Sequence, residues 1–268
     1  MKTRIISGLC MVPLLLVVYF GGYWLAAVCI FVGFVGVREF YNGFRAMDVH
    51  PCSAIGYGAL FVLYLLNGFY PGNLHLLLAW LVLVIMVSSL YMFDVQHHSP
   101  IDAMATMTGI IYIEFFSFHI VLIDQLGGAY RDLIWLVVLA AFGSDIFAYF
   151  TGVLIGKHKM APHLSPKKTI EGAVGGVLGS ALLCGLFGYF FTPEFFGSSI
   201  LIGFFGAAFA MCGDLTASAY KRRMGIKDYG NLIPGHGGIM DRFDSILFTG
   251  PFVYYYIVIV LQHFQLVF

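Results

Sequence analysis

Apolar stretches long enough to cross a bilayer recur along the chain, and short polar segments separate them. A hydrocarbon core about 30 Å thick needs roughly 20 consecutive apolar residues in a helix. The pattern predicts nine transmembrane helices, over residues 5–22, 24–44, 54–70, 74–93, 102–124, 132–155, 170–191, 197–219 and 245–266. The predicted fold class is therefore all-α, a polytopic integral membrane helix bundle.

The positions of the basic residues orient these helices. With the N-terminus in the cytoplasm, only Arg131 of the 14 Lys and Arg residues falls on the outer side. Cytoplasmic loops of membrane proteins carry an excess of Lys and Arg. The bias predicts a multi-pass protein of the inner (plasma) membrane whose functional site faces the cytoplasm.

Composition supports this class. Sixty per cent of the residues are hydrophobic, 10% are charged and the mean hydropathy is +0.89, which excludes an ordinary soluble domain. The five cysteines stand singly in or beside apolar runs, so neither a disulfide framework nor a zinc site is predicted. The net charge is zero, and no nucleic acid is expected as a partner.

The segment "CGDLTASAYKRR", 212–223, places chemistry at the end of the eighth predicted helix. If the helix continues, Asp214, Ser218, Lys221 and Arg222 share one face. An ionised aspartate about two turns below a basic rim needs a wet cavity, a partner or a metal. A structural salt bridge is an equally good interpretation of Asp214 alone.

A second polar segment, "IPGHGGIMDRFDS" at 233–245, begins the last predicted helix. Asp241 and Asp244 there would suit the positive end of the helix, so N-terminal capping explains them in part. Capping does not explain the glycine-rich "PGHGG", where backbone amides can approach a ligand closely. His236 has no second ligand at zinc spacing, and a phosphate hydrogen bond fits it better.

A third segment, "HLSPKKTIEG" at 163–172, predicts a helix start with Ser165 as cap and Pro166 in the first position. Lys167 and Lys168 would then lie in the first turn, where a bound anion would favour them. The alternative is that they are only juxtamembrane anchors.

Deeper in the membrane, Asp145, Tyr149, Gly152 and Gly156 share a helical face that could line the cavity holding Asp214. Glu114 and His119 have no motif around them, and we expect only polar contacts inside the bundle for both.

These segments combine carboxylates for a hard cation, basic residues for phosphate charge and glycines for close backbone approach. Oxygen ligands shared with substrate phosphates are typical of Mg²⁺, the expected cofactor. Phosphoryl or nucleotidyl transfer, in which positioning and charge neutralisation dominate, uses this equipment. The membrane setting indicates a lipid substrate.

The same residues resemble the signature of the phosphatidate cytidylyltransferase (CDP-diacylglycerol synthase) family. The matching positions are Ser218, Lys221, Arg222, Lys227, Asp228, Gly230, Pro234, His236, Gly237, Gly238, Asp241, Arg242 and Asp244. Tyr220 departs from the aliphatic residue or Phe expected there, and "SDIFAYFTG" and "SPKKTIEG" also look like family segments. The resemblance covers about residues 140–250, while the N-terminal spans resemble the family only in length and hydrophobicity.

The resemblance implies a magnesium-dependent reaction of CTP with phosphatidate that yields CDP-diacylglycerol and pyrophosphate. Asp214 and Asp241 would hold the metal. The expected catalytic residues are Asp214, Asp241, Lys221, Arg222 and Lys227. Those expected to bind substrate are Asp145, Ser165, Lys167, Lys168, Thr169, Glu171, Ser218, Asp228, His236, Gly237, Gly238, Arg242 and Asp244.

We therefore assign residues 1–130 to membrane spans of open role and 131–268 to a catalytic membrane domain. A homodimer is one possible assembly. One alternative function is a CTP-dependent lipid kinase of the polyprenol or phytol type, which would release CDP. A transporter of phosphorylated solutes is the other, although all the polar segments lie on one side of the membrane.

Overall fold

The computed structural model describes residues 12–232 and 237–263. Within them the chain divides into two compact units. The first comprises residues 1–125 and 223–242, and the second comprises 126–222 and 243–268. Each unit is described by itself.

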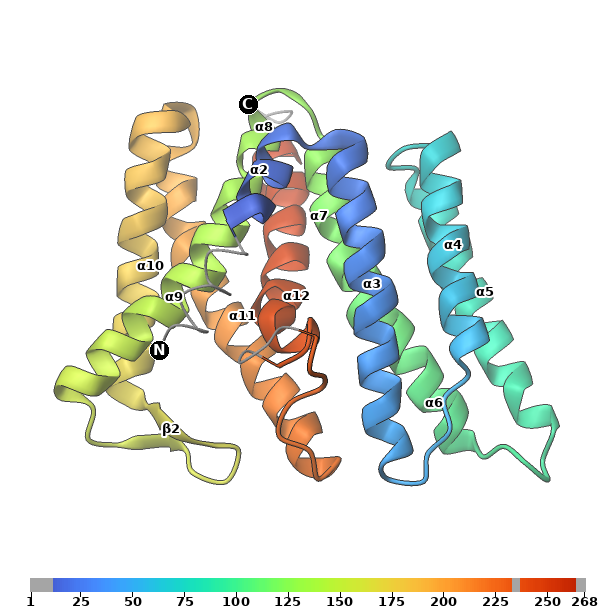
Figure 1. Ribbon diagram of the computed structural model, residues 1–268. Helices are drawn as coiled ribbons and strands as arrows, with labels where there is room; N and C mark the ends of the chain where they lie inside the picture. The colour runs from blue at the N-terminus through green and yellow to red at the C-terminus, as the bar shows by residue number, and fades with distance from the viewer. Residues whose placement is uncertain (1–11, 233–236, 264–268) are drawn as a thin grey trace. The chain divides into compact units, whose positions relative to one another are not determined.

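The first unit is built of helices (Figure 1). Its elements are α2 Val12–Phe20, α3 Gly22–Arg45, α4 Ser53–Phe69, α5 Leu74–Leu90, the 3₁₀ turn η1 Tyr91–Phe93, α6 Pro100–Gly109, the π-helix η2 Ile110–Phe115 and α7 Phe116–Gln125. α3 packs against α4 and α7, and α5 packs against α4 and α6.

Local sequence explains where these helices begin and how they pack. Ser99 and Asp102 form a reciprocal capping box at the start of α6, with Pro100 in its first turn. The buried Trp80 donates its indole N–H to the Ala59 carbonyl at 2.9 Å, and Tyr41 donates its hydroxyl to Thr106 O at 2.6 Å. The polar atom of each of these two side chains therefore has a partner while the ring fills the core.

The second unit adds a short hairpin to its helices. Its elements are α8 Gly128–Asp132, α9 Ile134–Ile155, β1 Lys159–Ala161, β2 Ser165–Thr169, α10 Ile170–Phe191, the 3₁₀ turn η3 Pro193–Phe195, α11 Phe196–Arg223, α12 Met240–Tyr255 and the π-helix η4 Tyr256–Gln262. α11 ends, and α12 begins, in segment 223–242 of the first unit. β1 and β2 are antiparallel, with Lys159 opposite Thr169.

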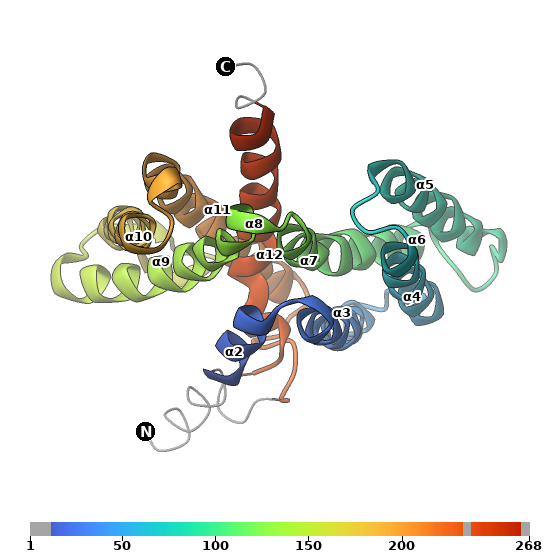
Figure 2. The same cartoon turned by 90° about the horizontal axis from the view of Figure 1, so that it is seen from above.

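Small residues bring α9 and α10 close together, and Figure 2 shows the two helices side by side. A Cβ at Gly172 would lie 2.8 Å from the Ala148 carbonyl, and one at Gly176 would lie 2.8 Å from the Ser144 carbonyl. The opposite face of α10 is apolar and exposed, as Leu178 and Leu182 show. This distribution suits a helix with one face against protein and one against lipid.

The predicted all-α membrane bundle is confirmed, with the two-stranded hairpin as its addition. Helices occupy the described part of every predicted span. Seven helical stretches in residues 12–232 and 237–263 are long and apolar enough to cross a membrane, while α4 has only 17 residues. Because α2 is described only from Val12, the total of nine crossings stays a prediction.

Candidate active site

The lysine-rich segment before α10 is a strand and not the predicted helix start. Lys167 and Lys168 lie in β2, and α10 begins after β2 ends. The prediction of Ser165 as a helix cap followed by Pro166 is therefore wrong. The backbone of this segment pairs with β1 instead, so its polar groups find partners without a helix.

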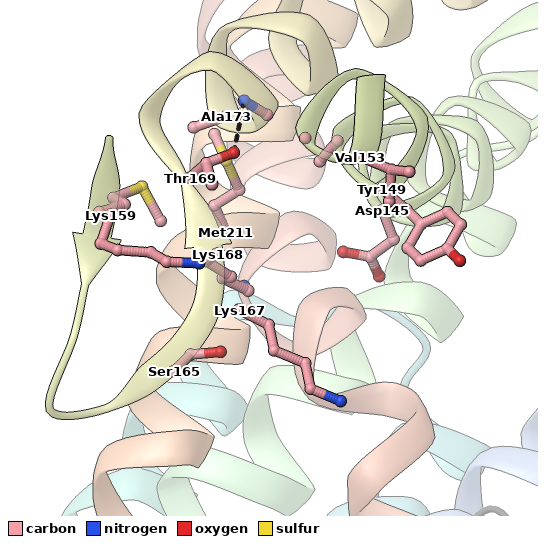
Figure 3. Close-up of a pocket in the computed structure, with 14 residues that line it drawn as sticks. Asp145, Tyr149, Val153, Lys159, Ser165, Lys167, Lys168, Thr169, Ala173 and Met211 are labelled. Atoms are coloured by element: carbon pink, nitrogen blue, oxygen red, sulfur yellow. Dashed lines mark hydrogen bonds between the residues drawn. The ribbon is translucent and has the colours of Figure 1, made fainter. Parts of the chain in front are cut away.

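Thr169 is the residue that caps α10. Its hydroxyl accepts a hydrogen bond from the Gly172 amide at 3.1 Å, drawn as the dashed line in Figure 3. Threonine is a good helix cap, and it stands directly before the apolar run. The cap fixes the end of β2, and with it the position of the two lysines.

Glu171 binds the segment that leads into β1. Its carboxylate accepts hydrogen bonds from the backbone amides of Lys157 at 3.0 Å and His158 at 3.1 Å. The His158 ring lies 2.6 Å from the same carboxylate. The geometry gives Glu171 a structural role, and substrate binding by it stays a prediction.

A cavity of about 490 Å³ lies in this unit, lined by the hairpin and by α9, α10 and α11. Five residues predicted to bind substrate line it: Asp145, Ser165, Lys167, Lys168 and Thr169. Tyr149 and Gly152 line it too, which confirms part of the predicted face, whereas Gly156 and Asp214 are not among the described lining residues. Figure 3 shows Asp145 on the α9 side and the lysines on the β2 side of the cavity. Its lining therefore combines both signs of charge with apolar surface.

The predicted polar face of α11 is confirmed. The helix continues to Arg223, and Ser218 donates its hydroxyl to the Asp214 carboxylate at 3.4 Å. Lys168 from β2 forms an ion pair with Asp214, and both side chains are about one-quarter exposed, at 24% and 25%. Arg222 donates its Nε–H to the carbonyl of Leu164 at 3.2 Å. The hairpin therefore contacts α11 at two places, through an ion pair at Asp214 and a hydrogen bond at Arg222 in the last turn.

An acidic side chain, Asp244, is buried near the start of α12. Asp145, Asp214 and Lys221 lie within electrostatic range of it, the first two with charge of the same sign and the third with charge of the opposite sign. The backbones of α11 and α12 also approach closely, since a Cβ at Gly213 would overlap the Asp244 carbonyl oxygen. The fold therefore concentrates negative charge beside basic residues.

The described residues of the signature segment, 224–232 and 237–242, include two that contact Asp241 in the first unit. The carboxylate of Asp241 accepts hydrogen bonds from the amides of Tyr229 at 2.8 Å and Gly238 at 3.0 Å. Gly237 has a φ of 84°, and a Cβ there would lie 2.7 Å from the same carboxylate. Asp241 thus holds the backbone before α12 and lies in the first turn of that helix, as predicted, while capping of α12 by its side chain stays a prediction.

The predicted site residues fall into two groups. Asp145, Lys168, Asp214 and Asp244 come together in the second unit. Asp241 belongs to the first unit with Gly237 and Gly238, and so do Lys227, Asp228 and Arg242. The joint metal site of Asp214 and Asp241 stays a prediction. His236 and Pro234 lie outside the described residues.

The described residues contain no cluster of three side chains that could bind a metal ion without help from a substrate. No three His, Cys, Asp or Glu side chains of residues 12–232 and 237–263 form a group that could hold a metal ion. Magnesium sites commonly use only one or two carboxylates, completed by water and substrate phosphates. The carboxylate oxygens near Asp214 fit that chemistry.

Two residues near these groups were missed by the sequence analysis. Lys159 in β1 lines the cavity with the two predicted lysines. Glu39, in α3, is buried and accepts hydrogen bonds from the amides of Ile239 and Met240 in the signature segment. An acidic residue inside a predicted span is the signal that could have identified Glu39.

Known proteins with similar sequences identify the family of this chain. A profile of the cytidylyltransferase family matches residues 2–260. A phosphatidate cytidylyltransferase of Synechocystis is 32% identical over 270 residues, covering 90% of both chains. One of Helicobacter pylori is 32% identical over 73% of this chain and 75% of its own. One of Bacillus subtilis is 42% identical over 50% of this chain and 49% of its own. On the family match and the Synechocystis relative, this chain belongs to the cytidylyltransferase family.

Proposed function

We propose that this protein is a phosphatidate cytidylyltransferase. It converts CTP and phosphatidate into CDP-diacylglycerol and pyrophosphate. It works at the cytoplasmic face of the inner membrane, where the predicted orientation places the basic loops. The relatives from Synechocystis, Helicobacter pylori and Bacillus subtilis carry this activity in their names.

The observation that carries the proposal is the charged cavity of the second unit. Lys159, Lys167 and Lys168 line it opposite Asp145. The side chains of the Lys168–Asp214 pair are about one-quarter exposed, so solvent and ligands can reach both charges. A bound phosphate group would take the place of the carboxylate beside the lysine, and a bound cation would take the place of the lysine beside the carboxylate.

The reaction requires little covalent help from the protein. A phosphatidate phosphate oxygen attacks the α-phosphorus of CTP, and the bond from that phosphorus to the β-phosphate oxygen breaks. The nucleophile is already anionic, so no general base has to remove a proton. The barrier comes from repulsion between two anions, and nearby cationic side chains lower it. Lys168, Lys221 and Arg222 are the residues proposed for that role in the second unit.

Magnesium is the proposed cofactor. Asp214 would bind it, with Asp241 as the second ligand suggested by the family signature. When bound, the ion would neutralise phosphate charge and orient the CTP phosphates. The protein's own contribution is to hold carboxylate oxygens and lysines within reach of the same phosphates.

Labelled CTP tests the proposal with purified protein in detergent, phosphatidate and Mg²⁺. Label on the α-phosphate should enter the lipid product, and label on the γ-phosphate should leave as pyrophosphate. Diacylglycerol, which lacks the attacking phosphate, should give no product. Absence of labelled pyrophosphate from an otherwise intact, lipid-supplied protein would refute the assignment.

The same experiment separates the rival functions. A CTP-dependent lipid kinase would transfer the γ-label to the lipid and leave the α-label in CDP. A transporter of phosphorylated solutes would leave CTP intact and would accumulate solute in reconstituted vesicles. Both results would contradict cytidylyl transfer.

A further inference from the structure

In the first unit, the described residues of the signature segment, 224–232 and 237–242, pack against α3, which lies near the N-terminus of the chain. Four positions of α3 contact this segment: Gly36, Glu39, Phe40 and Gly43. Gly36 lies close to the Met240 side chain, and Gly43 lies close to the side chains of Met224 and Ile226. The Phe40 ring packs against the Tyr229 ring, with centroids 6.0 Å apart. The spacing i, i+3, i+4 and i+7 is one face of a helix, so one face of α3 contacts residues in 224–230 and 238–240.

Glu39 is the polar centre of that surface. One carboxylate oxygen accepts the Ile239 amide at 3.1 Å, and the other accepts the Met240 amide at 3.0 Å. The residue is only 7% exposed. These amides begin α12, where backbone N–H groups have no partner inside the helix and the dipole favours negative charge. Glu39 supplies that charge from about 200 residues away in sequence.

Two signature glycines make room for this carboxylate. A Cβ built at Gly230 or at Gly238 would overlap the Glu39 carboxylate. Gly238 also donates its amide to Asp241, so the backbone between the two acids is held from both sides. The loop therefore folds around two carboxylates, one from α12 itself and one from α3.

We propose that Glu39 is a positioning residue for the signature loop. It fixes the amides of Ile239 and Met240, which sets the direction in which α12 begins and the place of Asp241. Rotation or fraying of this helix start would move the loop that carries Lys227 and Asp228. The inference rests on the proposed cytidylyl transfer, in which this loop takes part, and it gives the N-terminal spans a share in the active site.

Glu39→Gln in the full-length protein tests the proposal. The amide keeps the side-chain volume, but one acceptor oxygen becomes an NH₂ group that faces an N–H donor. We expect turnover of CTP to fall about 10- to 100-fold, because small displacements of reacting groups cost rates of this size. Hydrogen exchange in peptides covering 228–241 should rise at least about 10-fold. Glu39→Ala should show larger changes in both measurements.

Asp102→Asn is the matched control for loss of a buried capping carboxylate. Asp102 is 4% exposed and accepts the His50 amide in the same unit, remote in sequence from the signature. Its variant should leave exchange in 228–241 and activity per folded protein unchanged. Gly230→Ala disturbs the same contact from the loop, because its Cβ would overlap the Glu39 carboxylate, and it should change both measurements as Glu39→Gln does. Gly58→Ala is its control, because a Cβ there meets nothing within 4 Å, and it should change neither.

The exchange measurement needs no substrate, so it decides the role of Glu39 even if the wild-type protein makes no CDP-diacylglycerol. A rise confined to 228–241 in Glu39→Gln supports the proposal. Unchanged exchange there overturns it, and so does an equal rise throughout the chain, because Glu39 would then support the fold as a whole. If Glu39→Gln does not fold, Gly230→Ala decides by the same two measurements.

Discussion

Replacing Gly213 by alanine should separate α11 from α12 beside two carboxylates of the candidate site. A Cβ at this position would overlap the Asp244 carbonyl oxygen, below the 3.0 Å that real Cβ atoms keep. It would also lie 3.3 Å from the Cβ of Phe248. The obstructing atom belongs to the backbone of a helix and cannot rotate aside, so the two helices must move apart by several tenths of an ångström.

The cost follows from two opposing effects. Overpacking a close contact costs about 1–3 kcal/mol, whereas alanine gains about 1 kcal/mol over glycine inside a helix. The net loss of up to about 2 kcal/mol corresponds to a Tm lower by up to about 8 °C for a chain of this size. Asp214 follows Gly213, and Asp244 carries the obstructing carbonyl, so both carboxylates move. A 1 Å misplacement costs about 100-fold in rate, and a smaller shift should cost about 10-fold.

Gly197→Ala is the matched control, since it makes the same change in the same helix. A Cβ at Gly197 meets nothing within 4 Å, so this variant should keep its Tm or gain slightly. Thermal unfolding of both variants in one detergent measures stability, and pyrophosphate release measures activity. If Gly213→Ala matched Gly197→Ala in both assays, the close approach of α11 to α12 would be wrong.

Three further predictions concern the cap, the metal and the orientation. Thr169→Val removes the oxygen that accepts the Gly172 amide and should cost about 1 kcal/mol, seen as a Tm lower by about 2–4 °C. Asp214→Asn should lose at least about 100-fold of turnover while inserting and purifying normally; near-normal activity would exclude it as a metal ligand. In a cysteine-free protein, a cysteine at Lys159 should react with impermeant reagents only from the cytoplasm and one at Gly128 only from outside, so reaction from one side at both would overturn the orientation.

The helical fold was predictable because each membrane span needs a long apolar run, which the sequence displays directly. The hairpin was not. The motif Ser165–Pro166 has the composition of a helix start, and only pairing with Lys159–Ala161 decides for a strand. That pairing joins residues on the two sides of a turn. The pattern of polar and apolar residues within one of the two segments does not predict it. Thr169, four residues later, is an equally good cap and stands directly before the apolar run.

The candidate site was predictable where it lies on one helix or on neighbouring segments. The face of Asp214 and Ser218 follows from spacing alone, and the structure confirms it. Lys168 was expected to bind an anion of the substrate, and in the structure it pairs with a carboxylate of the protein itself, that of Asp214. Glu39 was missed because its hydrogen-bond partners lie about 200 residues away, and a single sequence does not report such a distance.

The glycines of the signature segment show how one residue type can satisfy two requirements. From the sequence, the glycines of "PGHGG" were predicted to let backbone amides approach a ligand closely, and Gly230 was only a position that matches the family signature. In the structure, Gly230 and Gly238 leave space for the Glu39 carboxylate, and Gly237 takes a positive φ beside Asp241. Loop amides that hold a carboxylate are already fixed in direction before any phosphate arrives, and preorganised donors lose less free energy on binding than mobile ones. The polar segment before α12 therefore has two roles. Its backbone amides hydrogen-bond the buried carboxylates of Glu39 and Asp241. The loop fixed by these hydrogen bonds carries basic residues of the proposed reaction.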